Sequence, residues 1–175
     1  QPLSQHFHAV WKNLPLAVRA FRELQARQPA ARFIWVGDGP ARAALAAANP
    51  DFVFCGVQRG DALAEPFASG DLFVFPSLTE TFGNVTLEAM ASGIATVAYR
   101  YGAAREHLVD GAHGAAITNG DEQAFVTAVC ELAQEPWRCL QRGQAARAAI
   151  EHLSPQSVSE HFADLLQSLR WRSAA

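Results

Sequence analysis

The stretch FVFPSLTETFGNVTLEAMASG, residues 73–93, decides how the rest of the chain is interpreted. It joins an apolar run typical of a buried strand, residues 72–75, to a turn and then to a helical pattern with Gly83 near its start. We expect this helix to span residues 82–91 and to stop at Gly93. The first N–H groups of a helix have no partner within it, and the helix dipole favours negative charge there. The stretch therefore predicts an anion site where a strand leads into a helix.

Two carboxylates flank this turn. Glu80 lies just before the expected helix, and Glu88 lies roughly a turn and a half inside it. Side chains with this separation can both face one ligand bound over the helix start. Taken alone, they would instead be a helix cap and a solvated helix residue, because carboxylates near helix starts are favoured for their own sake.

The composition indicates one globular domain. Half of the 175 residues are hydrophobic, which is enough apolar material for a full core. With 14 Lys and Arg against 17 Asp and Glu, and no basic run, a nucleic-acid partner is disfavoured. No apolar run approaches the roughly 20 residues that span a bilayer, and the first residues do not resemble a signal peptide. The three cysteines lack metal-ligand or CxxC spacing, so we expect a reduced, cytoplasmic protein.

Short apolar runs alternate with helical patterns along the chain. This alternation favours an α/β fold, a Rossmann-like open parallel sheet with helices on both faces. Strands are expected at residues 32–36, 51–55, 72–75, 95–99 and 115–118, and helices at 14–28, from 41 to about 48, and at 62–69, 82–91, 105–109, 121–134, 136–152 and 155–172. The last helix is amphipathic and could pack on this domain or reach towards another.

Ligands of such sheets bind beyond the carboxyl ends of the strands. The loops at residues 37–40, 56–61, 76–84 and 99–105 are therefore expected to line one crevice. The chain lacks a GxGxxG fingerprint, which disfavours a hydride-transfer enzyme. Asp38, in the GDGP turn, is expected to cap the following helix.

The chain has 13 arginines and one lysine, Lys12, placed just before the first expected helix. In a chain that otherwise uses arginine for positive charge, this lysine is a candidate phosphate contact. A pyridoxal phosphate cofactor would need Lys12 as its Schiff-base lysine, and the position before a first helix disfavours that role.

Residues 76–98, PSLTETFGNVTLEAMASGIATVA, resemble the signature of the group 1 (family 4) retaining glycosyltransferases of GT-B fold. Glu80 and Glu88 are the two ends of the family's E-x7-E motif. Further matches follow in the family's order: WKN at 11–13, VGDGP at 36–40, GVQR at 56–59 and GAAREHLVDGAHG at 102–114. A lone E-x7-E has little specificity, but the ordered set covers essentially the whole chain.

The resemblance implies that residues 1–175 are one nucleotide-sugar-binding domain, the carboxyl-terminal half of a two-domain enzyme. Glu80 would bind hydroxyl groups of the donor sugar, and Glu88 the ribose hydroxyls. The backbone N–H groups of Phe82, Gly83 and Asn84 would contact the sugar, those of Val85 and Thr86 the diphosphate, while Val57 and Arg59 would lie against the base and Gly37 in a loop beside them. Lys12 and Glu80 are the catalytic candidates.

The resemblance also implies a mechanism. Lys12 and the helix start would stabilise the departing diphosphate without a metal ion or other cofactor. Retention is ascribed in the family to attack on the face from which the diphosphate leaves, so Glu80 is not assigned as a nucleophile. Two carboxylates at one helix start also fit a glycosidase poorly, because hydrolases place theirs on either side of the bond.

The chain departs from the family in two informative places. The family commonly has an arginine five residues before its lysine, where this chain has Phe7. Either residues 1–9 do not continue the family's strand, or Lys12 binds the diphosphate alone. The amino-terminal domain, which binds the acceptor, is absent from this chain. We therefore expect donor binding without transfer.

Other expectations concern partners and alternatives. The acceptor would be a glycan or a lipid-linked glycan, and any peripheral contact with the inner face of a membrane would be made through the missing domain. A nucleotide-sugar epimerase of the same fold would share the cleft but not this full set of motifs. A binding module that has lost catalysis would keep the site described here.

Overall fold

A buried central strand, β4 (Ala95–Tyr99), organises the larger of two sheets in the computed structural model, which describes residues 13–172. Strand β3 (Leu72–Phe75) pairs with one edge of β4 and β5 (Gly114–Ile117) with the other, all in parallel. A side chain at Gly114 would place its Cβ 1.9 Å from the carbonyl oxygen of Thr96, so only glycine lets β5 approach β4 this closely.

A second, two-stranded parallel sheet consists of β1 (Ile34–Val36) and β2 (Val53–Gly56). Among residues 13–172, the strands thus form two ladders where the sequence predicts a single sheet. All described pairings are parallel, as the alternation of apolar runs and helices predicts.

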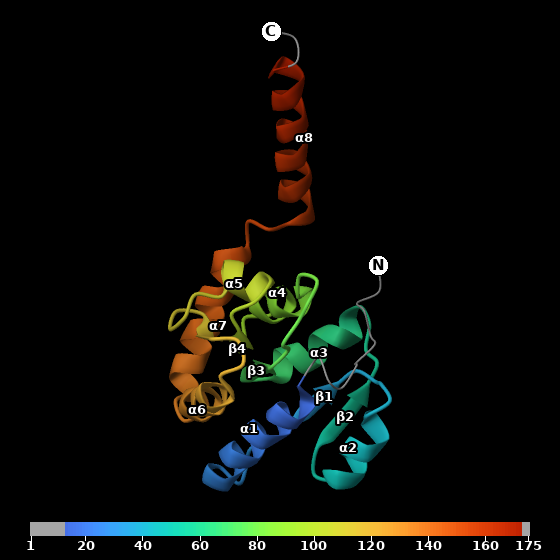
Figure 1. Ribbon diagram of the computed structural model, residues 1–175, viewed down its shortest axis with the longest axis vertical. Helices are drawn as coiled ribbons and strands as arrows, with labels where there is room; N and C mark the ends of the chain where they lie inside the picture. The colour runs from blue at the N-terminus through green and yellow to red at the C-terminus, as the bar shows by residue number, and fades with distance from the viewer. Residues whose placement is uncertain (1–12, 173–175) are drawn as a thin grey trace.

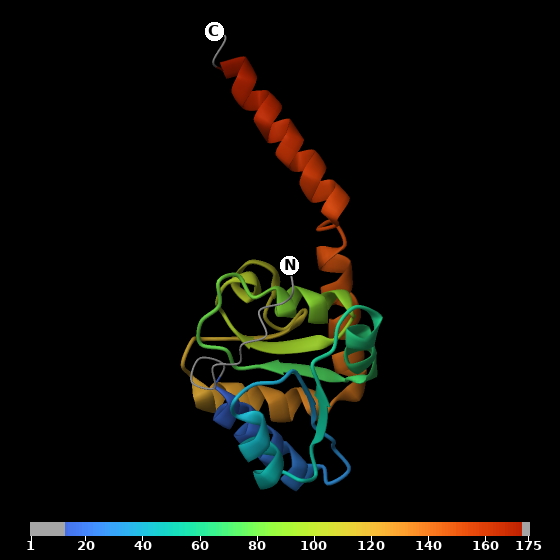
Figure 2. The same ribbon diagram turned by 90° about the vertical axis from the view of Figure 1, so that its right-hand side faces the viewer.

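Helices cover both faces of the β3–β4–β5 sheet (Figure 2). Helices α1 (Leu14–Arg27) and α6 (Glu122–Ala133) lie on one face, and α4 (Asn84–Ala91) and α5 (Ala103–His107) lie on the other. Helix α7 (Pro136–Ile150) packs on α4, where Met90 contacts Ala146 and Ile150. The predicted fold class, α/β with helices on both faces of a parallel sheet, is confirmed.

Helix α1 joins the two sheets. Its residue Phe21 stacks on Phe33 with ring centroids 5.0 Å apart and meets Phe52 edge-on at 5.2 Å, next to the smaller sheet. The same apolar cluster reaches β4 at Val97 and α6 at Phe125. Burying an aromatic side chain of this kind contributes roughly 1.5–3 kcal/mol. The periodic apolar face of α1 is thus what holds the two sheets together.

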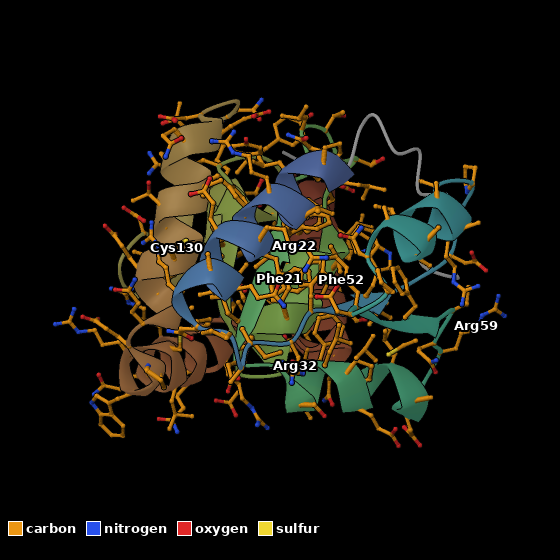
Figure 3. All side chains as sticks on the ribbon, turned by 90° about the horizontal axis from the view of Figure 1, so that it is seen from below. Phe21, Arg22, Arg32, Phe52, Arg59 and Cys130 are labelled. Carbon is orange, nitrogen blue, oxygen red and sulfur yellow. The ribbon has the colours of Figure 1, made fainter. Side chains whose placement is uncertain are left out.

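An ion pair reinforces this junction. Arg22 on α1 donates to both carboxylate oxygens of Asp51, at 2.6 and 2.7 Å, and its guanidinium lies 4.6 Å from the ring centroid of Phe52. Figure 3 shows the three labelled side chains Phe21, Arg22 and Phe52 gathered at this junction. The guanidinium holds the pKa of the Asp51 carboxyl well below its usual range.

The remaining helices are α2 (Arg42–Ala48), α3 (Asp61–Ser69) and α8 (Pro155–Arg172). Helix α8 extends away from the rest of the molecule (Figure 1). Its apolar side chains are accordingly exposed, with 53% of Val158, 60% of Phe162 and 55% of Leu165 accessible to solvent. The amphipathic pattern left open whether this helix packs on the domain or reaches away from it. In the structure, α8 does not pack on the domain.

Candidate functional site

The connection between β3 and α4 contains the turn that the sequence singled out. Pro76 and Ser77 follow β3 directly and are buried. Gly83 then adopts a left-handed conformation, with φ 88° and ψ 48°, and α4 begins at Asn84. The predicted start at Phe82 is therefore wrong by two residues, because a left-handed residue cannot continue a right-handed helix.

Glu80 is held by a hydrogen bond within this turn. The Ser77 hydroxyl donates a 2.5 Å hydrogen bond to Oε1 of Glu80. The α-carbon of Gly83 faces the stem of Glu80, where an added Cβ would lie 3.4 Å from Cγ. The carboxylate therefore has a defined position just before the start of α4.

The first turn of α4 contains N–H groups without hydrogen-bond acceptors among the described residues. The resemblance assigned the Thr86 N–H group to the diphosphate. In the structure this group instead donates a 3.0 Å hydrogen bond to the carbonyl oxygen of Gly83. Within residues 13–172, the N–H groups of Asn84 and Val85 have no acceptor. Two open N–H groups at a helix start, together with the helix dipole, favour an anion.

Glu88 lies one turn inside the same helix and is half-buried. Its Oε2 is shielded from solvent and, within the described part of the chain, has no hydrogen-bond partner. Burial raises the pKa of the Glu88 carboxyl. A shielded acceptor without a donor costs free energy, and a ligand hydroxyl would remove that cost.

The loop after β4 closes over the Glu80 turn. The N–H of Ala103 donates a 2.6 Å hydrogen bond to the carbonyl oxygen of Phe82. A Cβ at Gly102 would lie 2.3 Å from the same oxygen. The Phe82 ring meets His107 edge-on, with centroids 6.4 Å apart, and 37% of its surface remains exposed. The fourth loop predicted to line a crevice thus directly contacts the third.

The loops after β1 and β2 form a second group. The Gly37 N–H donates a 2.8 Å hydrogen bond to the carbonyl oxygen of Gly56, and Val57 is 41% exposed. Arg59 is exposed and lies at the periphery of the molecule, on the loop that leads from β2 to α3 (Figure 3). Gly37, Val57 and Arg59 follow strands of the smaller sheet, whereas Glu80 and Glu88 lie in the loop and helix that follow β3 of the larger sheet.

The expectation for Asp38 is wrong. Its carboxylate accepts a 2.8 Å hydrogen bond from the N–H of the next residue, Gly39, and α2 begins after Ala41 without a side-chain cap. The Asp38 carboxylate is therefore bonded within the turn and does not cap α2. Lys12 and Phe7 lie outside the described residues.

Ser77 and Gly102 lie in loops that the sequence predicted to line the crevice, but sequence reasoning gave neither residue a role. Ser77 is a small polar residue at the carboxyl end of a strand, three residues before Glu80, and this placement was the available signal. Nothing local in the sequence indicates the approach of Gly102 to Phe82, which depends on the fold.

Some arrangements are not found. Among residues 13–172, no group of three or more His, Cys, Asp and Glu side chains is placed to hold a metal ion. No helix within the same residues combines the length and apolar character needed to cross a bilayer.

Comparison with known proteins now identifies the family. Residues 4–135 match the family model described as "Glycosyl transferases group 1". The chain belongs to this family. It is 39% identical over 148 residues to a GDP-mannose-dependent alpha-mannosyltransferase of Mycobacterium tuberculosis, covering 84% of this chain and 38% of that protein. It is 34% identical over 140 residues to sulfoquinovosyl transferase SQD2 of Arabidopsis thaliana, covering 77% of this chain and 28% of the relative. The group 1 chain thus spans about a third of the length of these relatives.

Solved structures of GT-B glycosyltransferases share this fold. The group 1 chain superposes on sucrose-phosphate synthase from Thermosynechococcus elongatus with a TM-score of 0.78 at 21% identity, covering 94% of this chain and 43% of that one. The pneumococcal O-GlcNAc transferase GtfA, solved in complex with UDP and GlcNAc, gives a TM-score of 0.77 at 21% identity, covering 91% of this chain and 34% of that one. The predicted family and the predicted GT-B half are both confirmed.

Proposed function

We propose that this chain is the donor-binding domain of a retaining glycosyltransferase that moves a sugar from a nucleoside diphosphate sugar to an acceptor. One observation carries the proposal: the shielded Oε2 of Glu88 lacks a donor one turn inside a helix whose first two N–H groups lack acceptors. A ribose diphosphate supplies hydroxyl donors for the carboxylate and anionic oxygens for the N–H groups. A single nucleotide would therefore satisfy both sets of groups.

The other residues take roles around this centre. Glu80 binds hydroxyl groups of the sugar, and the backbone at Phe82, Gly83 and Asn84 borders the same sugar. Val57 and Arg59 lie against the base, with the Gly37 loop beside them. Lys12 adds a positive charge at the diphosphate.

The chemistry follows from the charges that develop on reaction. Breaking the anomeric bond places negative charge on the diphosphate, which the start of α4 and Lys12 stabilise. The acceptor attacks on the face from which the diphosphate departs, so the configuration is retained without a covalent intermediate on Glu80. No metal ion is required. Because this chain spans about a third of its relatives' length, we assign it donor binding and assign acceptor binding to a further domain.

Relatives suggest which donor to test first. Two mycobacterial relatives are named as GDP-mannose-dependent, at 39% and 31% identity, and the second is a phosphatidylinositol monomannoside mannosyltransferase. We propose GDP-mannose as the donor and a lipid-linked glycan as the acceptor.

The test is a calorimetric titration of the chain with GDP, UDP and ADP and with their sugars. We expect Glu88→Ala to weaken binding of the nucleoside diphosphate about tenfold or more. The hydrogen bonds of the Glu88 carboxylate to the ribose would be lost, and hydrogen bonds to charged groups contribute roughly 1.5–3 kcal/mol. We expect Glu80→Ala to weaken mainly the discrimination between sugars. Glu65→Ala, on the exposed surface of α3, is the control and should bind as the native chain does. Absence of heat with every nucleotide would refute the donor-site assignment.

A further inference from the structure

Ser77 lies at the junction between β3 and the loop that carries Glu80. Its surface is 4% exposed, although serine is a polar residue at the end of a strand. Its Oγ lies 2.5 Å from Oε1 of Glu80 and 3.1 Å from the carbonyl oxygen of Thr79. A hydroxyl has one proton to donate, and the shorter, charge-assisted bond to the carboxylate is the stronger of the two. The buried hydroxyl is therefore directed at Glu80.

The backbone of the turn also runs close to Glu80. A Cβ added at Gly83 would lie 3.4 Å from Cγ and 3.5 Å from Cβ of Glu80, so this part of the turn faces the Glu80 stem. The carbonyl of the intervening Phe82 is tied to Ala103. A free glutamate side chain loses rotamer entropy when it is fixed in one orientation. In this turn, the fold has already removed much of that freedom.

We propose that Ser77 is a positioning residue for Glu80, which holds the carboxylate in the orientation that receives the hydroxyl groups of the donor sugar. This inference rests on the function proposed above and names a residue outside the E-x7-E motif. A carboxylate can accept about four hydrogen bonds, so the bond from Ser77 leaves acceptor sites for a ligand. Ser77 acts on the sugar only through Glu80 and makes no contribution to the diphosphate.

The experiment separates the sugar from the nucleotide. The sugar increment is the ratio of the affinities of the chain for a nucleotide sugar and for its nucleoside diphosphate, measured by calorimetry with GDP-mannose and GDP and with UDP-glucose and UDP. We expect Ser77→Ala to reduce this increment about tenfold, in keeping with the loss of a bond to a charged group. Diphosphate affinity should stay at the native value. Ser77→Thr keeps the hydroxyl and should restore the increment.

A double-mutant cycle tests whether the effect passes through Glu80. Once Glu80→Ala is present, adding Ser77→Ala should cause no further loss of the sugar increment. Ser77→Cys fills nearly the same volume with a weaker donor, so it should also reduce the sugar increment. It replaces Ser77→Ala in the experiment if the alanine variant folds poorly. Unfolding temperatures are recorded for every variant.

The possible failures are distinct. A native chain that binds neither diphosphates nor their sugars refutes the proposed function, and a native chain without a sugar increment refutes the role of Glu80 and this proposal with it. If the native increment is present but Ser77→Ala and Ser77→Cys leave it intact, only the role of Ser77 is refuted. The same holds if these variants weaken diphosphate and nucleotide sugar equally, or if their effect adds in full to that of Glu80→Ala.

Discussion

The N–H group of Ala103 donates a 2.6 Å hydrogen bond to the carbonyl oxygen of Phe82, and this bond joins two loops that are about 20 residues apart in the sequence. Gly102 makes the approach possible, because a Cβ there would lie 2.3 Å from the same oxygen. Gly60 has nearly the same backbone conformation, with φ 56° and ψ −135° against φ 52° and ψ −133° at Gly102. Nothing lies within 4 Å of a Cβ at Gly60. The two glycines therefore form a matched pair.

Gly60→Ala should cost only the strain of placing alanine in a conformation that favours glycine, of order 1–3 kcal/mol. Gly102→Ala should cost this strain and, in addition, about 1 kcal/mol or more from displacing the Phe82 carbonyl and losing its hydrogen bond. The extra cost corresponds to an unfolding temperature lower by about 2–4 °C, measured by thermal unfolding of both variants. Equal unfolding temperatures would show that the Phe82 contact contributes nothing.

Glu88→Gln should change how stability depends on pH. Burial raises the pKa of the Glu88 carboxyl, so the folded chain keeps this proton to a higher pH than the unfolded chain does. Native stability therefore falls as pH rises from the ordinary carboxyl pKa through the raised one, and Glu88→Gln removes this fall. The unfolding temperature of the variant relative to the native chain should increase as pH rises from the ordinary carboxyl pKa through the raised one, measured without nucleotide.

Glu65→Gln provides the control for this measurement, because Glu65 is exposed on α3. Its difference from the native chain should stay constant over the same range. A constant difference for Glu88→Gln as well would mean that burial of the Glu88 carboxylate has no energetic cost. The predicted combination is a variant that is more stable at neutral pH and binds nucleotide less well.

The Arg22–Asp51 pair should contribute stability at neutral pH and lose it in acid. The pKa of the Asp51 carboxyl is held well below its usual range, so the contribution is present above the usual pKa and disappears as pH falls through the lowered one. Asp51→Asn should therefore unfold at a lower temperature than the native chain at neutral pH, with the two converging in strong acid. A difference that persists unchanged in acid would assign the effect to packing.

Arg22→Lys tests the geometry of the same pair. Lysine keeps the charge but cannot bond both carboxylate oxygens in a fork or place a guanidinium over the Phe52 ring, so a lower unfolding temperature is expected at neutral pH. The matched control is Arg138→Lys, whose partner Glu135 lies three residues away on an exposed surface. That substitution should have an effect within about 0.5 kcal/mol.

Removal of α8 should leave the stability of the rest of the chain unchanged. A chain that ends at Leu153 loses a helix that extends away from the remaining domain, as both ribbon views show (Figures 1 and 2). Its unfolding free energy should stay within about 0.5 kcal/mol of the native value, measured by thermal unfolding. Its solubility should increase, because the exposed Phe162 and Leu165 are removed. A marked loss of stability would show that α8 folds back onto the domain in solution.

The sequence predicts the parts of the fold that depend on local patterns. The helix expected at residues 121–134 is present as α6, where the regularly spaced Phe125, Val129 and Leu132 are buried and Asp121, just before its start, accepts a hydrogen bond from the N–H of Ala124 at 2.9 Å. Those features are set within one or two helical turns, where periodicity and capping act.

The sequence did not predict features that depend on distant contacts. Gly83 is left-handed in a turn whose neighbouring carbonyl, that of Phe82, is held by Ala103, so the helix starts two residues later than its pattern indicates. The importance of Ser77 depends on its burial, which only the packed turn determines. The E-x7-E motif can be recognised in the sequence, but the hydrogen bond from Ser77 to Glu80 cannot.

The division into two sheets also has a consequence for motion. Within residues 13–172, the β1–β2 ladder shares no strand pairing with the β3–β4–β5 ladder, and the aromatic contacts of α1 connect the two. A unit joined by side-chain packing alone can open without unfolding its neighbour. Amide hydrogens of β1 and β2 should therefore exchange with solvent faster than those of β4. A ligand that bridges both sheets should slow the exchange in β1 and β2 towards the rate in β4.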